Sequence, residues 1–194
     1  MKIIELPKEF IVYDMEWTAW EGSKERNWSN PNEHREIFDI GAVLVTGDDF
    51  NNNATYRQLV VLEAVPELPK YSVDLTGITQ EKLNKNGIPF NDMLSAFKKF
   101  CNNLHIYAWG EDGAVIIENC KLKKLKNPFS PDQIHNMRNV FKQHGIPAEN
   151  YMSSTIVEYF GHKNKHTSHH GLDDALNIVE ALQLLRIELT EQQN

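Results

Sequence analysis

The chain has 194 residues, a formal net charge of −7, 41% apolar residues and 24% charged residues. These values are ordinary for one soluble domain with a sizeable core, and the acidity disfavours a protein that coats nucleic acid through a basic surface. No window approaches the roughly 20 apolar residues of a membrane span, and two cysteines without CxxC spacing argue against a disulfide framework or a thiolate zinc site. We therefore expect a cytoplasmic protein that binds no membrane, with a single domain over residues 1–194 and a core over about 9–189.

The first third of the chain predicts three consecutive strands. Residues 9–16 carry an apolar run from Phe10 to Tyr13, as in a strand that is buried on both faces, and residues 37–46 are a second predicted strand. The segment 18–34 between them is polar and contains glycine, asparagine and proline, which is typical of a loop. We place a hairpin turn at 51–53 and a third strand at 56–65, with antiparallel pairing throughout.

After about residue 90, apolar residues at helical spacing alternate with short strands. We predict short strands at 104–110 and 133–137. Helices are predicted at 90–100 with Asn91 as the N-cap, at 114–122, from 137 to Gly145, at 150–160 and at 172–189. This order predicts an α/β fold with one mixed sheet and helices on its faces.

Two acids stand at the end of the first strand, in the sequence FIVYDMEW. Residues i and i+2 of a strand point to the same side, so Asp14 and Glu16 project next to each other. Two carboxylates at this spacing disfavour each other's charged form unless a cation lies between them, and Mg²⁺ prefers such oxygen ligands. The alternative is that both are exposed acids at a strand end.

A second group of chemically active residues begins the C-terminal helix, in HHGLDDALNI. Asp173 and Asp174 lie where acids are favoured by the helix dipole, which by itself explains them. His169 precedes Asp174 by five residues, a spacing that lets a loop histidine reach back over the first helical turn. A histidine can accept a proton from water near neutral pH.

A third acidic group, Glu111 and Asp112, follows the strand that we predict at 104–110. Capping of the next helix explains these acids without any further role. All three groups nevertheless lie at strand ends or helix starts, and open α/β sheets bind ligands in the crevice at the carboxyl ends of their strands.

Three segments, VYDMEW, AWGEDGAVI and HHGLDDA, resemble the ordered motifs of the DEDD 3′→5′ exonucleases, in the subfamily with a histidine in the third motif. REIFDIGAVLV (35–45) is similar to the second strand of that family, and VDLTGITQEKL (73–83) to its leucine-threonine-glycine-isoleucine loop. The branch that looks most similar is that of the ERI-type RNA-trimming exonucleases. The resemblance implies a ribonuclease H-like fold, a mixed five-stranded sheet flanked by helices.

The resemblance also implies an activity and the residues that carry it. Four carboxylates would hold two divalent cations, Mg²⁺ or Mn²⁺, with the first of them bridging both ions: Asp14, Glu16, Asp112 and Asp174. His169 would be the general base. The product would be a nucleoside 5′-monophosphate released from the 3′ end of single-stranded RNA or DNA. Adjacent residues compete for three of these places: Glu111 for that of Asp112, His170 for that of His169, and Asp173 for that of Asp174.

Apolar residues near these motifs are candidates for binding the terminal base. Met15 and Trp17 flank the acid pair, and the family-like loop carries Leu75 and Ile78. Single-strand binders hold bases on such side chains. Leu75 and Ile78 are equally well explained as core residues.

Two further segments leave other functions open. The basic run KLKKLK (121–126) could contact phosphates, although lysines near a helix C-terminus are also favoured by its dipole. The segment 161–170 contains four histidines, which permits a zinc site, although its composition favours a mobile loop. The alternatives to an exonuclease are therefore a non-catalytic nucleic-acid-binding or regulatory protein with this fold, and a zinc-dependent hydrolase.

Overall fold

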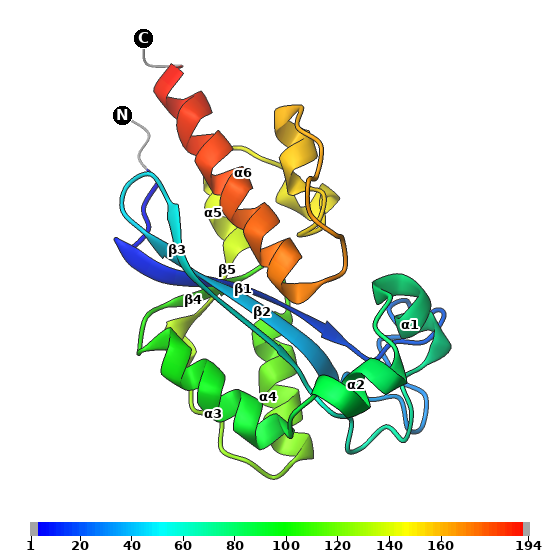
Figure 1. The fold of residues 1–194 in the computed structure, drawn as a ribbon. Helices are drawn as coiled ribbons and strands as arrows, with labels where there is room; N and C mark the ends of the chain where they lie inside the picture. The colour runs from blue at the N-terminus through cyan, green and yellow to red at the C-terminus, as the bar shows by residue number, and fades with distance from the viewer. Residues whose placement is uncertain (1–3, 192–194) are drawn as a thin grey trace.

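A five-stranded mixed sheet forms the centre of the protein in the computed structural model, which describes residues 4–191 (Figure 1). Its strands are β1 (Glu9–Trp17), β2 (Ile37–Thr46), β3 (Asn51–Leu59), β4 (Ile106–Ala108) and β5 (Ile134–Asn136). Their order in the sheet is β3-β2-β1-β4-β5. β1, β2 and β3 pair antiparallel, whereas β4 runs parallel to β1 and β5 parallel to β4. The predicted mixed five-stranded sheet is confirmed.

Helices cover both faces of this sheet (Figure 1). They are α1 (Lys70–Thr76), α2 (Gln80–Asn86), α3 (Phe90–Cys101), α4 (Asp112–Leu122), α5 (Met137–Gln143) and α6 (Gly171–Glu191). Short 3₁₀ segments occur at Pro131–Gln133, Ala148–Asn150 and Ile156–Phe160. One face packs against α5 and α6 and the other against α3 and α4, while α1 and α2 lie beyond the end of β1.

The alternation of side chains along β1 divides the core in two. Phe10 and Val12 point into the cluster that contains α6, whereas Ile11, Tyr13 and Met15 point into the cluster that contains α3 and α4. Both rows are apolar because both faces are covered, which explains the continuous apolar sequence. The period of two places the next residues of the first row, Asp14 and Glu16, on the side of α6.

The third strand begins earlier in the chain than predicted. The asparagines at 51–53 belong to β3, and the turn lies before them, at residues 47–50. Phe50 is buried and packs edge-on against Phe10, so the apolar anchor of this hairpin is in its turn. Residues 51–55 form an exposed edge of the sheet, where asparagine side chains are well solvated.

Three other predictions about local structure were wrong. Pro89, not Asn91, holds the N-cap position of α3. Residues 150–160 contain a turn and a 3₁₀ segment instead of one helix. The segment 73–83 is not one loop, because it comprises the end of α1, a turn at Gly77 with φ of 66°, and the start of α2.

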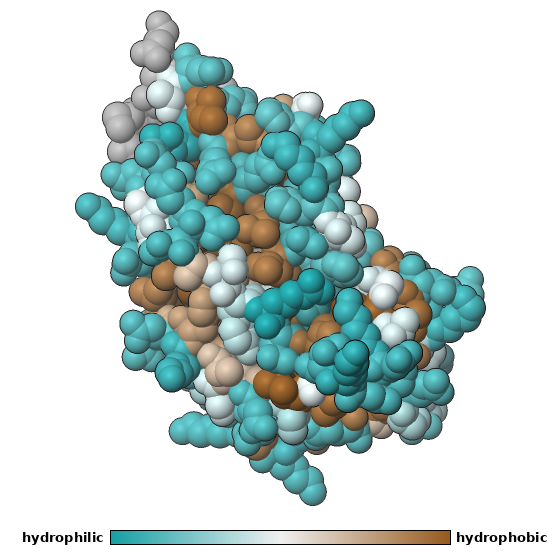
Figure 2. All heavy atoms as spheres, viewed as in Figure 1, coloured by the Kyte–Doolittle hydropathy of each residue, from teal (hydrophilic) through white to brown (hydrophobic). Residues whose placement is uncertain are grey.

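The surface is largely hydrophilic. On the face seen in Figure 2, polar side chains predominate, and apolar ones are exposed in small separate areas. Among the helices in residues 4–191, none combines the length and the apolar character that crossing a bilayer requires.

The start of α6 lies directly on the sheet because two glycines face each other. A Cβ atom built on Gly41 of β2 would lie 1.8 Å from the backbone nitrogen of Leu172, and one on Gly171 would lie 2.7 Å from the carbonyl oxygen of Asp14. Backbone therefore packs on backbone at this point. A side chain cannot be added at Gly41 or Gly171 without displacing the helix.

A buried glutamate joins three segments at the start of β2. The Glu36 carboxylate is 1% exposed and accepts N–H bonds from Glu63, Ala64 and Val65. It also forms an ion pair with Lys123, whose side chain is 9% exposed. Lys123 comes from the basic run 121–126, so this lysine is not part of a solvated helix end. Burial raises the pKa of Glu36, but Lys123 and the three N–H groups outweigh this effect and hold the pKa below its usual value.

We expect the substitution Gly41→Ala to lower the free energy of unfolding by about 3 kcal/mol or more, because the new methyl group overlaps the backbone of α6. Urea denaturation of the whole chain measures this loss. The control is Gly145→Ala, where no atom lies within 4 Å of the new Cβ. That variant should lose only the roughly 1–2 kcal/mol of a left-handed residue. Equal losses in the two variants would contradict the close backbone contact.

We expect Glu36→Gln to lower the free energy of unfolding by about 3 kcal/mol near neutral pH, because it removes the buried one of the two carboxylates that pair with Lys123 and leaves the exposed Glu63 at 3.4 Å. The lowered folded-state pKa means that the parent gains this stability above the usual glutamate value of 4.5 and loses it as the pH falls through the folded-state pKa. The difference between the two proteins should therefore shrink in acid.

Denaturation curves recorded at neutral and at acidic pH test this dependence. The matched control is Glu149→Gln, which removes an exposed ion pair with Lys142 and should change stability by less than about 1 kcal/mol at any pH. A Glu36→Gln difference that stays constant with pH would rule out the charged contact.

Candidate active site

The end of β1 carries the first two acids on the face that α6 covers. Asp14 is 6% exposed and Glu16 is half-buried. Across the sheet, Asp14 is the register partner of Gly41 and Glu16 that of Asp39. The acids therefore lie beside the point where α6 meets the sheet.

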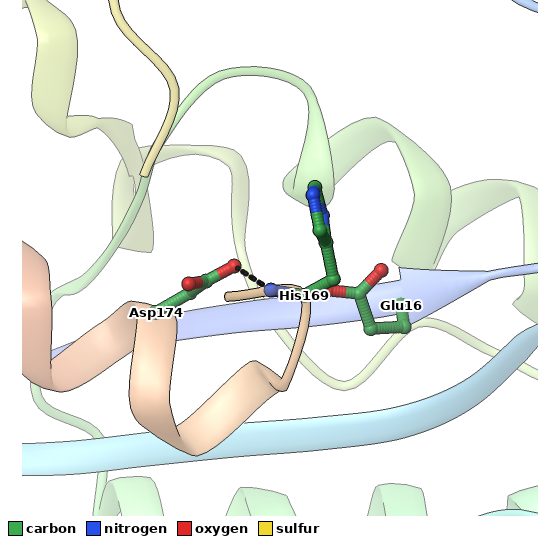
Figure 3. Close-up of side chains that lie close together, drawn as sticks. All are labelled: Glu16, His169 and Asp174. Carbon is green, nitrogen blue, oxygen red and sulfur yellow. Dashed lines mark hydrogen bonds between the residues drawn. The ribbon is translucent and has the colours of Figure 1, made fainter. Parts of the chain in front are cut away.

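The start of α6 brings a third acid and a histidine to the same place (Figure 3). The ligand atoms of Glu16, His169 and Asp174 all lie within 4.8 Å of one another. The backbone N–H of His169 donates to Oδ2 of Asp174 at 3.2 Å, the dashed line in Figure 3. His169 adopts a left-handed backbone conformation with φ of 60°, which turns the chain into the helix.

The first turn of α4 supplies the fourth acid. Asp112 is 3% exposed, and its Oδ1 accepts the N–H of Met15, the residue between the two acids of β1, at 3.1 Å. The side chain of Glu111 is 75% exposed and is paired with Arg35 at 3.0 Å. Of these two neighbours, the structure turns Asp112 toward the acid pair and Glu111 toward solvent.

Of the two competitors at the third motif, His170 contacts α1 and Asp173 contacts His170. His170 Nε2 lies 2.8 Å from the carbonyl oxygen of Thr76, at the end of α1. Its Nδ1 lies 3.4 Å from Oδ2 of Asp173. These contacts tie the loop before α6 to α1, whereas His169 and Asp174 lie with Glu16.

Burial raises the pKa values of all four acids, and repulsion by neighbouring carboxylates adds to this for Asp14, Glu16 and Asp174. The pKa of Asp14 is raised by burial and then by Asp112, Asp174 and Glu16, so these carboxyls interact directly with it. Burial raises the pKa of Glu16 as well, followed by the effect of Asp174.

For the other two acids, burial is again the largest effect. It raises the pKa of Asp112 to about 7 although N–H groups, including that of Met15, act in the opposite direction. It also raises the pKa of Asp174 to about 7, although the hydrogen bond from the N–H of His169 lowers this pKa. Burial lowers the pKa of His169, and His170 adds to this, so His169 is neutral over a wider range of pH than a free histidine.

This donor set fits hard divalent cations. Carboxylate oxygens are the ligands that Mg²⁺ and Mn²⁺ prefer, and a divalent charge offsets the repulsion among buried carboxylates. Oδ1 of Asp174 is buried and has no hydrogen-bond partner among residues 4–191, so it offers a free lone pair to such an ion. The residues that would hold the ions are Asp14, Glu16, Asp112 and Asp174.

The four candidates for base contact differ in exposure. Met15 is 3% exposed and Ile78 is fully buried, so both are core residues that offer no side-chain surface to a base. Trp17 is half-buried and packs against the cluster under α3 and α4. Leu75 is 39% exposed on α1, the helix that contacts His170. Of the four residues, Leu75 is therefore the most exposed.

The histidine-rich segment 161–170 is attached to α6 by polar contacts. Lys165 Nζ lies 2.8 Å from Glu180, and His166 lies 3.9 Å from the same residue. In the part of the chain that the structure describes, no group of three or more potential metal ligands includes His162 or His166. The structure therefore offers no support for a zinc site in this segment.

Sequence reasoning missed one buried acid beside the site. Asp39 is fully buried in β2, pairs with Arg57 at 3.1 Å and accepts the N–H of Gly171 at 3.2 Å. It therefore holds the first residue of α6, and its charge contributes to the raised pKa of Glu16. The signal was an acid inside the apolar run IFDIGAVLV, where a charge requires a partner.

A second missed residue lies at the start of α5. Arg138 lies over the ring of Trp109, with 5.7 Å between its guanidinium carbon and the ring centroid. Its positive charge lowers the pKa of Asp112. A lone arginine at the start of a predicted helix carries no signal of this role, because the contact depends on how the helix packs.

Comparison with known proteins shows the family and the fold of the chain. A family model described as an exonuclease, RNase_T, matches residues 11–182. The 3′-5′ exoribonuclease 1 of Mus musculus is 25% identical over 179 residues, which cover 86% of this chain and 50% of the relative. The chain thus spans about half the length of that relative.

Two solved structures show the same fold. One is the nuclease domain of 3′hExo, a DEDDh family member, bound to rAMP: the TM-score is 0.78 at 22% identity, over 94% of this chain and 92% of the other. The second shows 3′-end specific recognition of histone mRNA stem-loop by 3′-exonuclease. Its TM-score is 0.79 at 22% identity, over 96% of this chain and 67% of the other. With a family model that spans most of its length and a ribonuclease H-like fold, the chain belongs to the RNase_T exonuclease family and is a distant homologue of the ERI-type 3′→5′ exoribonucleases.

Proposed function

We propose that this protein is a metal-dependent 3′→5′ exonuclease, which hydrolyses phosphodiester bonds at the 3′ ends of single-stranded RNA or DNA and releases nucleoside 5′-monophosphates. One observation carries the proposal. Four carboxyls and one imidazole from three distant segments of the chain gather at one end of the sheet. A non-catalytic protein with this fold has no need of such a costly buried arrangement.

Each residue has a task that its position supports. Asp14, Glu16, Asp112 and Asp174 would hold two divalent ions. Such a pair of ions stabilises the attacking and the leaving oxygen of an in-line displacement. His169 lies beside Glu16 and Asp174, and its lowered pKa keeps the ring neutral and able to accept a proton from the attacking water.

The substrate class is inferred from relatives and from the site. The mouse relative is named an exoribonuclease, which favours RNA. The net charge of −7 argues against wide contact with a duplex, so a single-stranded end is the better substrate. Leu75 on α1 offers apolar surface on which the terminal base could rest.

We expect Asp14→Asn to reduce cleavage at least about a thousandfold, because metal ions in such sites supply several kcal/mol of transition-state stabilisation. The assay follows 5′-labelled single-stranded RNA, single-stranded DNA and blunt duplexes, in Mg²⁺ or Mn²⁺ and in EDTA. The control variant is Asp173→Asn, whose Oδ2 lies 3.4 Å from Nδ1 of His170, and it should keep the rate within about threefold.

The free energy of unfolding provides a second readout for Asp14→Asn. Without metal, the variant should be at least as stable as the parent, since the substitution replaces a buried carboxyl whose charged form is disfavoured by burial and by the neighbouring acids. If Asp14→Asn degrades the labelled strands at the rate of the parent, the site assignment is wrong. Activity of the parent that persists in EDTA would argue against the metal.

We expect His169→Ala to lower the rate constant by about 10²–10⁴-fold, the usual contribution of a general base. The control is His162→Ala, an exposed histidine of the same segment, which should leave the rate unchanged. Single-turnover rate constants of the parent and both variants, measured from acid to neutral pH, test this prediction. A His169→Ala variant with the rate and pH profile of the parent would remove this residue as the base.

A further inference from the structure

A pair of histidines lies at the end of the sheet opposite to the acids. His105 immediately precedes β4, whereas Asp112 follows the other end of that strand. His135 lies in the neighbouring strand β5. Nδ1 of His105 is 2.8 Å from Nε2 of His135, and the ring centroids are 4.9 Å apart.

The backbone on both sides of this pair is held by the sheet. The carbonyl oxygen of His105 accepts the N–H of Ile11 at 2.9 Å, and His135 is the register partner of Tyr107. The Tyr107 ring stacks on the His135 ring, with 4.7 Å between centroids and 21° between planes. The two imidazoles therefore face each other from fixed backbone positions, and only rotation of the side chains changes their separation.

The spacing of the two nitrogens suits ligands of one metal ion. Metal–nitrogen bonds are about 2.0–2.1 Å long. The two donor nitrogens therefore lie roughly 2.9 Å apart when the nitrogen–metal–nitrogen angle is a right angle, and roughly 3.3 Å apart when it is tetrahedral. The observed separation of 2.8 Å is that of a hydrogen bond between the two rings, and an ion that replaces the shared proton needs a separation that differs from it by only about half an ångström. Burial lowers the pKa of His135, and His105 adds to this effect, which favours the neutral form that binds metals.

A carboxylate lies near the pair. Asp132 precedes β5 and is exposed to solvent. Its pKa is lowered by hydrogen bonds from Ser130 and from its own backbone, and further by both His105 and His135, so its charge interacts with both rings. Rotation of an exposed aspartate can bring one oxygen to an ion that the histidines hold.

We propose that His105 and His135 form a binding site for a divalent transition-metal ion such as Zn²⁺, Ni²⁺ or Cu²⁺, with Asp132 and water completing the coordination. Imidazole nitrogen selects these borderline ions, whereas Mg²⁺ prefers the all-oxygen cluster at the other end of the sheet. The ion would join the strand β5 to the residue before β4. The site is independent of the proposed hydrolysis, since none of its residues belongs to the acid cluster.

Calorimetric titration of the whole chain with Zn²⁺ in saturating Mg²⁺ tests this proposal. The parent should bind one more equivalent of Zn²⁺ than either His105→Ala or His135→Ala. The matched control, His162→Ala, removes an exposed histidine outside the pair and should bind as the parent does. Because binding is measured, the result does not depend on whether the protein hydrolyses nucleic acid.

A second measurement locates the ion. In NMR spectra of the parent, Zn²⁺ in saturating Mg²⁺ should shift the Cε1–H resonances of His105 and His135, and not that of His162. His105→Gln, a conservative change at an exposed position, should abolish the shift at His135. Equal Zn²⁺ stoichiometry in the parent, His105→Ala and His135→Ala would overturn the proposal. So would the loss of one bound Zn²⁺ in His162→Ala alone.

Discussion

The backbone contact between Gly41 and Gly171 is the constraint on which the candidate site depends. Asp14 comes from a strand, whereas His169 and Asp174 come from the start of a helix more than a hundred residues later, and only the position of that helix brings them together. Because backbone packs on backbone, the helix start has little freedom to move. The hydrogen bond from Gly171 to a buried aspartate of β2 adds a directional restraint.

This rigid placement holds an arrangement that is unfavourable in itself. Burial raises the pKa values of four carboxyls, and repulsion by neighbouring acids adds to this for three of them, so the fold must keep together groups that are unfavourable when charged. The N–H of Met15 and the N–H of His169 each stabilise one carboxylate directly. Functional sites commonly hold groups at a cost to local stability, and the two apolar clusters on either side of the sheet offset this cost.

Much of the fold follows from local patterns. The apolar runs of β1 and β2, the helical spacing of α3 and α6, and the order of the strands along the chain were predicted, because each depends on residues within a few positions of one another. The start of β3 was misplaced because Phe50, in the turn, anchors the hairpin through a contact with a distant strand. Lys123 was misjudged for a similar reason, since its partner Glu36 lies far away in the sequence.

The sequence by itself determined the chemistry that is available: three ordered motifs with acids, a histidine and the spacings of an exonuclease family. It left open whether Asp112 or Glu111 faces the metals, because adjacent residues at a helix start differ in direction by about 100°, and that direction depends on packing. Only the tertiary structure decided that Asp112 faces the acid pair while Glu111 meets Arg35. In the same way, only the fold showed that Ile78 is core and Leu75 is surface.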